Sequence, residues 1–222
     1  MAEDRLAPTR VGVLGSGEVG RRLAAGFHGC GHDVVLGTRD PSKSELREWV
    51  AGDGAGIAVG TFAESAAHGK LLVMAVLGNA AEAAITAAGP ENFSGKVVID
   101  AMNPLDMSGW PPKLSIDGQD SLGEQVQRAL PEAKVVKAFN IIGNPYFVQP
   151  SFSEGRPTML IAGNDEAAKE TVGAVLAEFG WPDVVDVGGI EASRELEAIC
   201  ILWVKIGAAR NAWDHGFKLL VG

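Results

Sequence analysis

Residues 11–20 read VGVLGSGEVG, and this stretch decides the fold. Val11–Leu14 is a continuous apolar run of the kind that forms a buried strand, and an amphipathic helical stretch follows from Glu18 to about Gly29. A strand, a G-x-G-x-x-G loop and a helix in this order indicate a dinucleotide-binding site. The alternative is a turn with incidental glycines, and the flanking strand and helix favour the dinucleotide.

The three glycines of the motif have separate physical roles. Gly15 allows the tight turn out of the strand, Gly17 has no side chain to block a pyrophosphate, and Gly20 lets the helix approach the sheet. The start of the helix then offers free N–H groups and the positive end of its dipole to the phosphates.

The rest of the chain alternates short apolar runs with helical stretches, which is typical of an α/β fold with a mostly parallel sheet. Further strands are expected at residues 34–36, 57–59, 71–76, 96–100, 135–139, 158–162 and 184–187. Helices are expected at residues 44–50, 62–67, 79–88, 123–130 and 166–179, with one or two more between residue 190 and about residue 220. Residues 102–120 are rich in Pro, Gly and Asp and should form a long surface loop.

This pattern predicts a Rossmann-like, doubly wound, mostly parallel sheet with helices on both faces. Residues 1–222 would form a single dinucleotide-binding Rossmann domain, in which residues 190–222 are a C-terminal helical extension and a possible dimer contact.

Composition and charge exclude several classes of partner. The formal net charge is −9 and the chain has no run rich in Lys and Arg, so we expect no binding to nucleic acid and none to an anionic membrane surface. The longest apolar runs, residues 70–77 and 199–206, are too short to span a bilayer, and the first ten residues lack the apolar core of a signal peptide. We therefore expect a cytoplasmic protein without a membrane span.

Cysteines and histidines show no pattern of a metal site. Cys30 and Cys200 lie far apart without the spacing of metal ligands, and the four histidines are scattered. Both cysteines are expected to be buried thiols. No metal, no catalytic histidine and no other catalytic side chain are predicted.

The end of the second strand distinguishes NADP from NAD. NAD-binding proteins usually place a carboxylate there for the ribose hydroxyls. Here residues 37–43 read GTRDPSK, so that Arg39 and Lys43 supply two positive charges and Thr38 a hydroxyl. An arginine fork suits a 2′-phosphate, and Asp40 is interpreted as a turn or cap residue. The sequence therefore favours NADP(H), with ordinary solvated charges as the alternative.

Ligands of open α/β sheets lie beyond the carboxyl ends of the strands. By this rule, the residues expected to contact the ligand are 101–104 and 138–140 together with Ala75, Val76, Leu77 and Gly78. Asn103 and Asn140 could serve a carboxamide or a sugar, but asparagine is also a common turn residue. Phe139 could border a nicotinamide or fill the core, and Lys137 should lie on the opposite face as a solvated lysine.

Six stretches, in order along nearly the whole chain, resemble the coenzyme F(420)-dependent NADP reductases, whose second substrate is an 8-hydroxy-5-deazaflavin. The same unit looks like the cytosolic NADPH-binding domain of the transmembrane ferric reductases. The stretches are VGVLGSGEVGRRLA (11–24), GHDVVLGTRDPSK (31–43), VVKAFN (135–140), MLIAGNDEAAKETV (159–172), GGIEASRELEAICILWVKIG (188–207) and GFKLL (216–220).

The resemblance implies roles for matching residues. Ser16, Gly17, Glu18 and Val19 would hold the pyrophosphate, and Thr38, Arg39 and Lys43 the 2′-phosphate. Gly78 and Asn144 would line the nicotinamide half, and Asn140 would lie where the deazaflavin faces the nicotinamide. The cofactor-binding residues expected from motif, strand ends and resemblance together are Gly15, Ser16, Gly17, Glu18, Val19, Thr38, Arg39, Lys43, Ala75, Val76, Leu77, Gly78, Asn103, Ala138, Asn140 and Asn144.

The resemblance further implies a homodimer, which suits the apolar stretch 199–203. The expected activity is hydride transfer between NADP(H) and a small-molecule acceptor, namely coenzyme F(420) or a related flavin. Two departures fall at the acceptor edge. Many members of the family carry proline after the fourth strand where this chain has Leu77-Gly78, and the loop 105–120 is longer than usual. The alternatives are a non-catalytic NADPH-binding sensor module and an imine or pyrroline-carboxylate reductase.

Overall fold

A single eight-stranded sheet forms the centre of the computed structural model, which describes residues 6–116 and 118–222. The strand order is β10-β9-β8-β5-β4-β1-β2-β3. Neighbouring strands run parallel except β8 and β9, which are antiparallel. The strands are β1 Arg10–Leu14, β2 Asp33–Thr38, β3 Ala58–Thr61, β4 Leu71–Met74, β5 Val97–Asp100, β8 Lys134–Lys137, β9 Met159–Gly163 and β10 Val184–Asp186.

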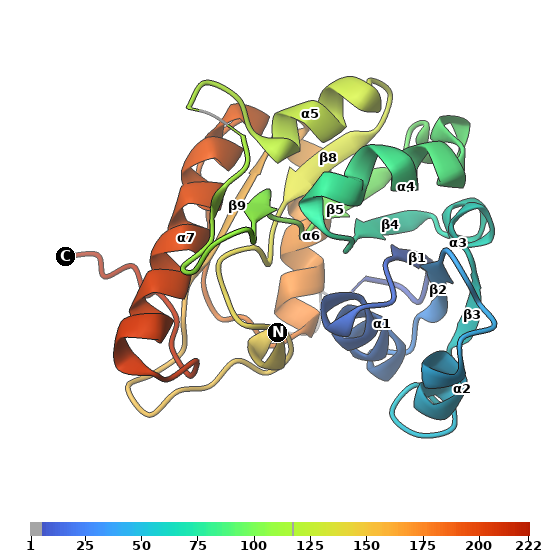
Figure 1. Ribbon diagram of the computed structural model, residues 1–222, viewed down its shortest axis with the longest axis horizontal. Helices are drawn as coiled ribbons and strands as arrows, with labels where there is room; N and C mark the ends of the chain where they lie inside the picture. The colour runs from blue at the N-terminus through green and yellow to red at the C-terminus, as the bar shows by residue number, and fades with distance from the viewer. Residues whose placement is uncertain (1–5, 117) are drawn as a thin grey trace.

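Helices cover both faces of this sheet (Figure 1). One buried cluster includes Leu23 and Phe27 of α1 and Val172 of α6, and the other includes Phe62 of α3 and Ile85 of α4. The structure confirms the predicted Rossmann-like, doubly wound α/β fold. The helices are α1 Glu18–Gly29, α2 Ser44–Val50, α3 Phe62–His68, α4 Ala81–Ala88, α5 Leu122–Ala129, α6 Glu166–Glu178 and α7 Ser193–Arg210.

The strand order reverses between β1 and β4. The chain runs outward from β1 through β2 to β3, then returns to place β4 on the other side of β1 and continues through β5 to β8. The connections on either side of this point lead away in opposite directions, so the carboxyl ends of β1 and β4 border the usual ligand crevice of such sheets.

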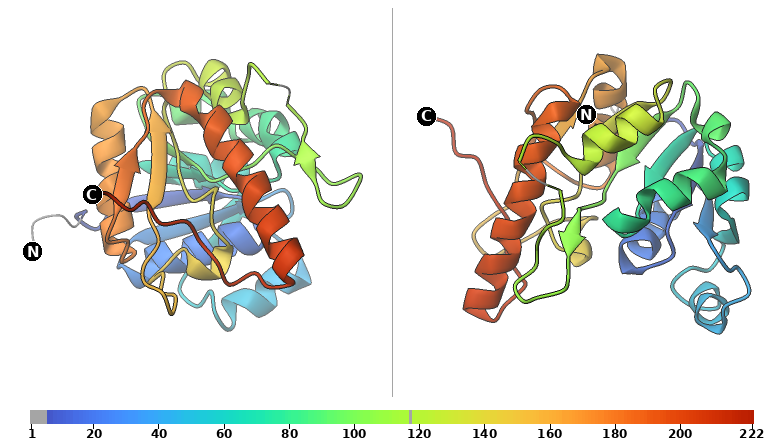
Figure 2. Two further views of the ribbon diagram at one scale, coloured as in Figure 1. Left: turned by 90° about the vertical axis from the view of Figure 1, so that its left-hand side faces the viewer. Right: turned by 45° about the horizontal axis from the view of Figure 1, so that its top comes forward.

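The predicted long loop contains a small hairpin that the sequence did not indicate. β6 (Leu105–Asp106) pairs antiparallel with β7 (Lys113–Leu114), and β7 packs near α7 (Figure 2). Two-residue strands carry too little apolar alternation to be recognised from sequence. Asp117, which belongs to the predicted loop, lies outside the described residues.

The C-terminal extension is one helix followed by an extended tail. α7 ends at Arg210 because Asn211 adopts the left-handed conformation, with φ 50°. The tail then passes the start of β9, where the amide of the preceding residue, Thr158, donates to the Phe217 carbonyl over 2.9 Å. The prediction of helix to about residue 220 is therefore wrong, because the tail exchanges helical hydrogen bonds for contacts with a distant strand.

Candidate functional site

The glycine loop has the geometry that a phosphate-binding turn requires. Gly15 has φ +130°, and a Cβ added there would lie 2.3 Å from the Ala75 carbonyl oxygen. A Cβ on Gly20 would lie 1.7 Å from the Gly15 carbonyl oxygen, so only glycine lets α1 start this close to β1. A Cβ on Gly17 would meet nothing within 4 Å. The loop is therefore closed toward the protein at two glycines and open toward solvent at the third.

The open side is where α1 begins. Gly17 is the N-cap, it has no side-chain capping bond, and the first helical bond runs from the Arg21 amide to the Gly17 carbonyl. The Arg21 guanidinium donates to the Ser16 carbonyl over 2.9 Å and stiffens the turn. The amides of the first helical turn precede that bond, and together with the helix dipole they favour an anion above Gly17.

The end of β2 lies against the same loop. The Ser16 hydroxyl donates to Thr38 Oγ1 over 2.9 Å, and Thr38 is buried. This bond connects the glycine loop, which is predicted to bind the pyrophosphate, to the end of β2, which is predicted to bind the ribose and its 2′-phosphate. Arg39 and Lys43 follow with exposed side chains. Both cations therefore lie on the segment that leaves the sheet beside the glycine loop.

Asp40 is occupied within its own turn. Its carboxylate accepts from the Ser42 amide over 2.9 Å and from the Ser42 hydroxyl over 2.5 Å. These hydrogen bonds hold the pKa of the Asp40 carboxyl below its usual value. The interpretation of Asp40 as a turn residue is confirmed, because its carboxylate accepts from the backbone and the side chain of Ser42.

The carboxyl ends of β4 and β5 touch one another. Ala75 is buried, Val76 is half-buried and Leu77 is 75% exposed. A Cβ added to Gly78 would lie 2.5 Å from the Asn103 carbonyl oxygen, so a larger residue at position 78 would push the two strand ends apart. Residues 75–78, which follow β4 and are predicted to border the nicotinamide, therefore form one continuous surface with Asn103, which follows β5.

Asn103 and Asn140 bind each other across the ends of β5 and β8. The Asn103 side-chain amide donates to the Asn140 carbonyl over 2.9 Å. The Asn140 side-chain amide donates to Asn103 Oδ1 over 3.1 Å and to the Leu196 carbonyl of α7 over 2.9 Å. Asn140 is 3% exposed, and its Oδ1 accepts no hydrogen bond within the described part of the chain. Both amides therefore organise the strand ends.

Of the remaining predicted residues, only Asn144 reaches the glycine loop. Its side-chain amide lies 3.5 Å from Glu18 Oε2. The Ala138 side chain is fully buried, so only its backbone is available to a ligand. Phe139 packs against Phe147 with ring centroids 5.3 Å apart and is 1% exposed, which decides for core filling over a nicotinamide contact.

Lys137 overturns the expectation of a solvated lysine. It is fully buried, and its ammonium lies 2.9 Å from Asp100 Oδ2 and 2.7 Å from Glu197 Oε1. Strand alternation correctly predicted that Lys137 lies on the opposite face of the sheet from its neighbours in sequence. That face is not exposed to solvent, because α5 and α7 cover it. One signal was present in the sequence. Asp100 ends β5 as Lys137 ends β8, and two opposite charges that end apolar runs of adjacent strands can pair directly.

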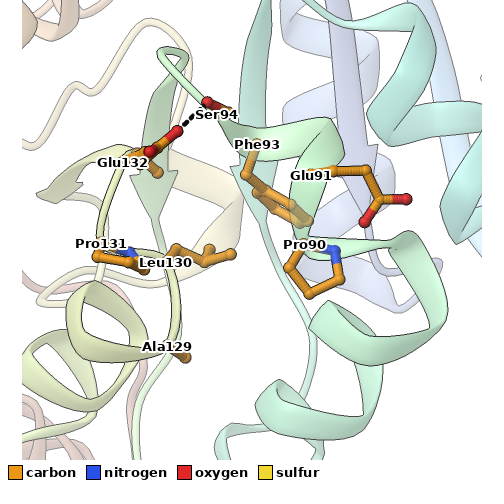
Figure 3. Close-up of a pocket in the computed structure, with 9 residues that line it drawn as sticks. Pro90, Glu91, Phe93, Ser94, Ala129, Leu130, Pro131 and Glu132 are labelled. Atoms are coloured by element: carbon orange, nitrogen blue, oxygen red, sulfur yellow. Dashed lines mark hydrogen bonds between the residues drawn. The ribbon is translucent and has the colours of Figure 1, made fainter.

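A separate cavity of about 210 Å³ lies beside the amino ends of β5 and β8 (Figure 3). Its lining includes Phe93 and Ser94, which precede β5, and Ala133, which precedes β8. The Ser94 hydroxyl donates to Glu132 across its rim over 2.5 Å. This cavity is at the amino ends of the strands, whereas the glycine loop is at the carboxyl end of β1, so the two are unrelated.

Within residues 6–116 and 118–222, no group of three His, Cys, Asp or Glu side chains is arranged to hold a metal ion. In the same part of the chain no helix combines the length and apolar character needed to cross a bilayer.

The Cys200 thiol of α7 is expected to resist alkylation in the native protein. Burial raises its pKa to about 12, so its thiolate fraction at pH 8 is about three orders of magnitude below that of an exposed cysteine. Iodoacetamide at pH 8 followed by peptide mass spectrometry should leave Cys200 unmodified until the protein is denatured. Equal rates in native and denatured protein would contradict the burial.

The fold and the loop together define a dinucleotide-binding protein of the Rossmann class. The family model described as NADP oxidoreductase, coenzyme F(420)-dependent, matches residues 10–104. A crystal structure of a proposed F(420)-dependent NADP reductase from Arthrobacter sp. FB24 is 38% identical, with a TM-score of 0.92 over 97% of this chain and 100% of that chain. The chain belongs to the coenzyme F(420)-dependent NADP oxidoreductase family.

Curated relatives extend the similarity over nearly the whole chain. The F(420)-dependent NADP reductase of Methanothermobacter marburgensis is 26% identical over 95% of this chain and 97% of its own length. Metalloreductase STEAP3 of Rattus norvegicus is 30% identical over 90% of this chain, and the match spans 38% of that protein.

Proposed function

We propose that the protein binds NADP(H) at the glycine loop and transfers a hydride between its nicotinamide and a deazaflavin of the coenzyme F(420) type or a related flavin. The observation that carries this proposal is the uncapped start of α1 above Gly17, next to the two cations that follow β2. The relatives named F(420)-dependent NADP reductases support the choice of acceptor.

The phosphate end of the proposed site is built from adjacent segments. Gly15 makes the turn, and the backbone from Ser16 to Val19 would bind the pyrophosphate through N–H groups. Thr38, Arg39 and Lys43 would hold the 2′-phosphate. Arg39 suits this role because its planar guanidinium can donate two parallel hydrogen bonds to phosphate oxygens.

The nicotinamide would lie across the ends of the neighbouring strands. The surface made by Gly78 against the Asn103 carbonyl is continuous with the glycine loop through Ala75, which contacts Gly15. Asn144 meets Glu18 on the other side of the loop. The residues that would border the nicotinamide half are Ala75, Val76, Leu77, Gly78, Asn103, Ala138, Asn140 and Asn144.

Hydride transfer requires little from the protein beyond position. NADPH, when bound, would supply the chemistry as a hydride donor to the acceptor ring. The protein's contribution is to hold two rings face to face and keep water away, a positional effect worth about 7–11 kcal/mol in model reactions. Strand ends that carry backbone groups, amides and apolar side chains match that requirement.

Exposed aromatic side chains beside the strand ends support a flat second substrate. The β6–β7 hairpin starts immediately after Asn103 and Pro104, and its Trp110 is 63% exposed. The Trp110 ring meets Trp213 of the tail with centroids 6.1 Å apart, and Trp213 meets Trp203 of α7. Trp203 in turn lies against Gly143, next to Asn144. Such rings offer stacking surface to an aromatic acceptor.

We also propose that the protein is a homodimer through α7 and the tail. Leu202 is 49% exposed and Leu220 is 84% exposed, whereas Cys200 of the same apolar stretch faces the core. A second copy would bury these leucines. Light scattering on the purified protein would report the mass of one chain if this assignment is wrong.

Anaerobic mixing tests the activity. NADPH and oxidised coenzyme F(420) are combined with the protein, and both absorbance bands are followed. We expect NADPH to be oxidised and F(420) reduced in equal amounts. Parallel reactions with FMN, FAD and a cyclic imine identify a different acceptor. Tight NADPH binding with no hydride transfer to any of the four would contradict the reductase and favour an NADPH sensor.

A further inference from the structure

A buried cluster of three charges lies behind the strand ends and has no part in the proposed chemistry. Lys137 of β8 lies between Asp100 of β5 and Glu197 of α7, and the three residues are at most 1% exposed. Burial of ionic groups is costly, and a well-packed apolar cluster of similar volume is often at least as stable. Stability alone therefore does not explain why charges occupy this position.

The hydrogen bonds of the cluster lead to the proposed nicotinamide surface. The Lys137 ammonium donates to the Met102 carbonyl over 2.9 Å, and Asp100 Oδ1 accepts from the Met102 amide over 2.9 Å. Met102 is thus held through both of its backbone polar groups. Asn103 follows directly, and its carbonyl lies where a Cβ on Gly78 would be 2.5 Å away.

The cluster also attaches two helices to this surface. Glu197 accepts from the Leu122 and Gly123 amides at the start of α5, over 3.0 and 3.1 Å. The preceding residue, Leu196, accepts from the Asn140 side chain over 2.9 Å. The ends of β5 and β8, the start of α5 and the first turns of α7 are therefore joined by one buried network.

The ammonium is able to keep this role throughout the working pH range. Burial lowers the pKa of Lys137, but Asp100 and Glu197 outweigh burial and raise the pKa above its ordinary value. Lys137 therefore remains a donor to the Met102 carbonyl. Burial raises the pKa of Glu197, against the lowering by Lys137 and by the Leu122 amide.

We infer that Lys137, held by Asp100 and Glu197, is a positioning residue that fixes the Met102–Asn103 backbone as the floor on which the nicotinamide half of NADP(H) rests. This inference rests on the proposed function. The network does not include the glycine loop or the segment 38–43, so its loss should affect the nicotinamide half and spare the phosphate half.

Two ligands separate these halves without any hydride acceptor. NADPH carries the whole dinucleotide, whereas 2′,5′-ADP carries only the adenosine and the 2′-phosphate with one further phosphate. The test variant is the neutral triple D100N/K137M/E197Q, which leaves no unpaired buried charge. Its amide oxygens can still accept from the Met102 amide and from one of the Leu122 and Gly123 amides, which bind different oxygens of Glu197 in the wild type. The matched control is Lys169→Met, which removes another largely buried lysine that bridges two carboxylates, Asp186 and Glu166, outside the network.

Calorimetry on folded protein should show NADPH binding to the triple variant about tenfold more weakly than to the wild type. Its affinity for 2′,5′-ADP should stay within about twofold, and Lys169→Met should retain both affinities. Unchanged NADPH affinity in the triple variant, or equal weakening of both ligands, would overturn the inference. Wild-type protein that binds neither ligand would instead refute the proposed function.

Hydrogen exchange on the wild type tests the same inference if the triple variant does not fold. NADPH should slow exchange in peptides that cover residues 100–105, and 2′,5′-ADP should not. The same protection by both ligands, or by neither while NADPH is bound, would overturn the positioning role of Lys137.

Discussion

Gly17→Asp is expected to weaken NADPH binding severely in a protein that remains folded. Gly17 is the N-cap of α1, and a Cβ there meets nothing within 4 Å, so the substitution fits the fold. Aspartate is a preferred N-cap residue, and its carboxylate would accept from the amides that a pyrophosphate would use. The variant should therefore melt at or slightly above the wild-type temperature. Competition for those amides and charge repulsion should weaken NADPH by about 100-fold or more.

Calorimetry and thermal unfolding measure the two effects separately. Gly17→Ala is the matched control, because it fills the same open space without a charge. It should lose about tenfold in NADPH affinity, through steric exclusion of the pyrophosphate alone. An aspartate variant that binds NADPH as well as the wild type would show that no phosphate lies above this helix.

Arg39→Ala is expected to lower the affinity for NADPH by about 100-fold and the affinity for NADH by no more than about threefold. The difference arises because only NADPH carries the 2′-phosphate, to which a guanidinium donates charge-assisted hydrogen bonds. Lys43→Ala should show the same preference with a smaller loss of about tenfold, since a single ammonium binds less specifically.

Titrations of both nucleotides against each variant check this prediction. Arg156→Ala, which removes an exposed arginine from the loop before β9, is the control and should bind both nucleotides normally. Equal weakening of NADPH and NADH by Arg39→Ala would exclude a role in recognising the 2′-phosphate.

Local sequence determined most of the architecture and the phosphate end of the candidate site. The order of strands and helices follows from alternating apolar runs, and the open position at Gly17 follows from a motif of six residues. Arg39 and Lys43 lie on one short segment after β2, so their closeness to each other does not depend on contacts between distant residues. Even the turn role of Asp40 depends only on Ser42, two residues away.

The buried contacts behind the proposed nicotinamide end of the site, at the ends of β5 and β8, depended on residues far apart in the chain. Alternation placed Lys137 on the correct face of β8, but only the packing of α5 and α7 makes that face an interior. The structural bond of the Asn140 side-chain amide could not be predicted from local sequence, because its acceptor, the Leu196 carbonyl, lies 56 residues later in the chain.

The sequence alone therefore determined a doubly wound α/β chain with a dinucleotide-type glycine loop followed by cations, because these features are encoded by neighbouring residues. The tertiary structure decided where the hairpin and the tail lie, that Phe139 fills the core, and that Lys137 is buried between two carboxylates. Those features come from strands and helices far apart in the chain, and their environment is created only when the elements pack.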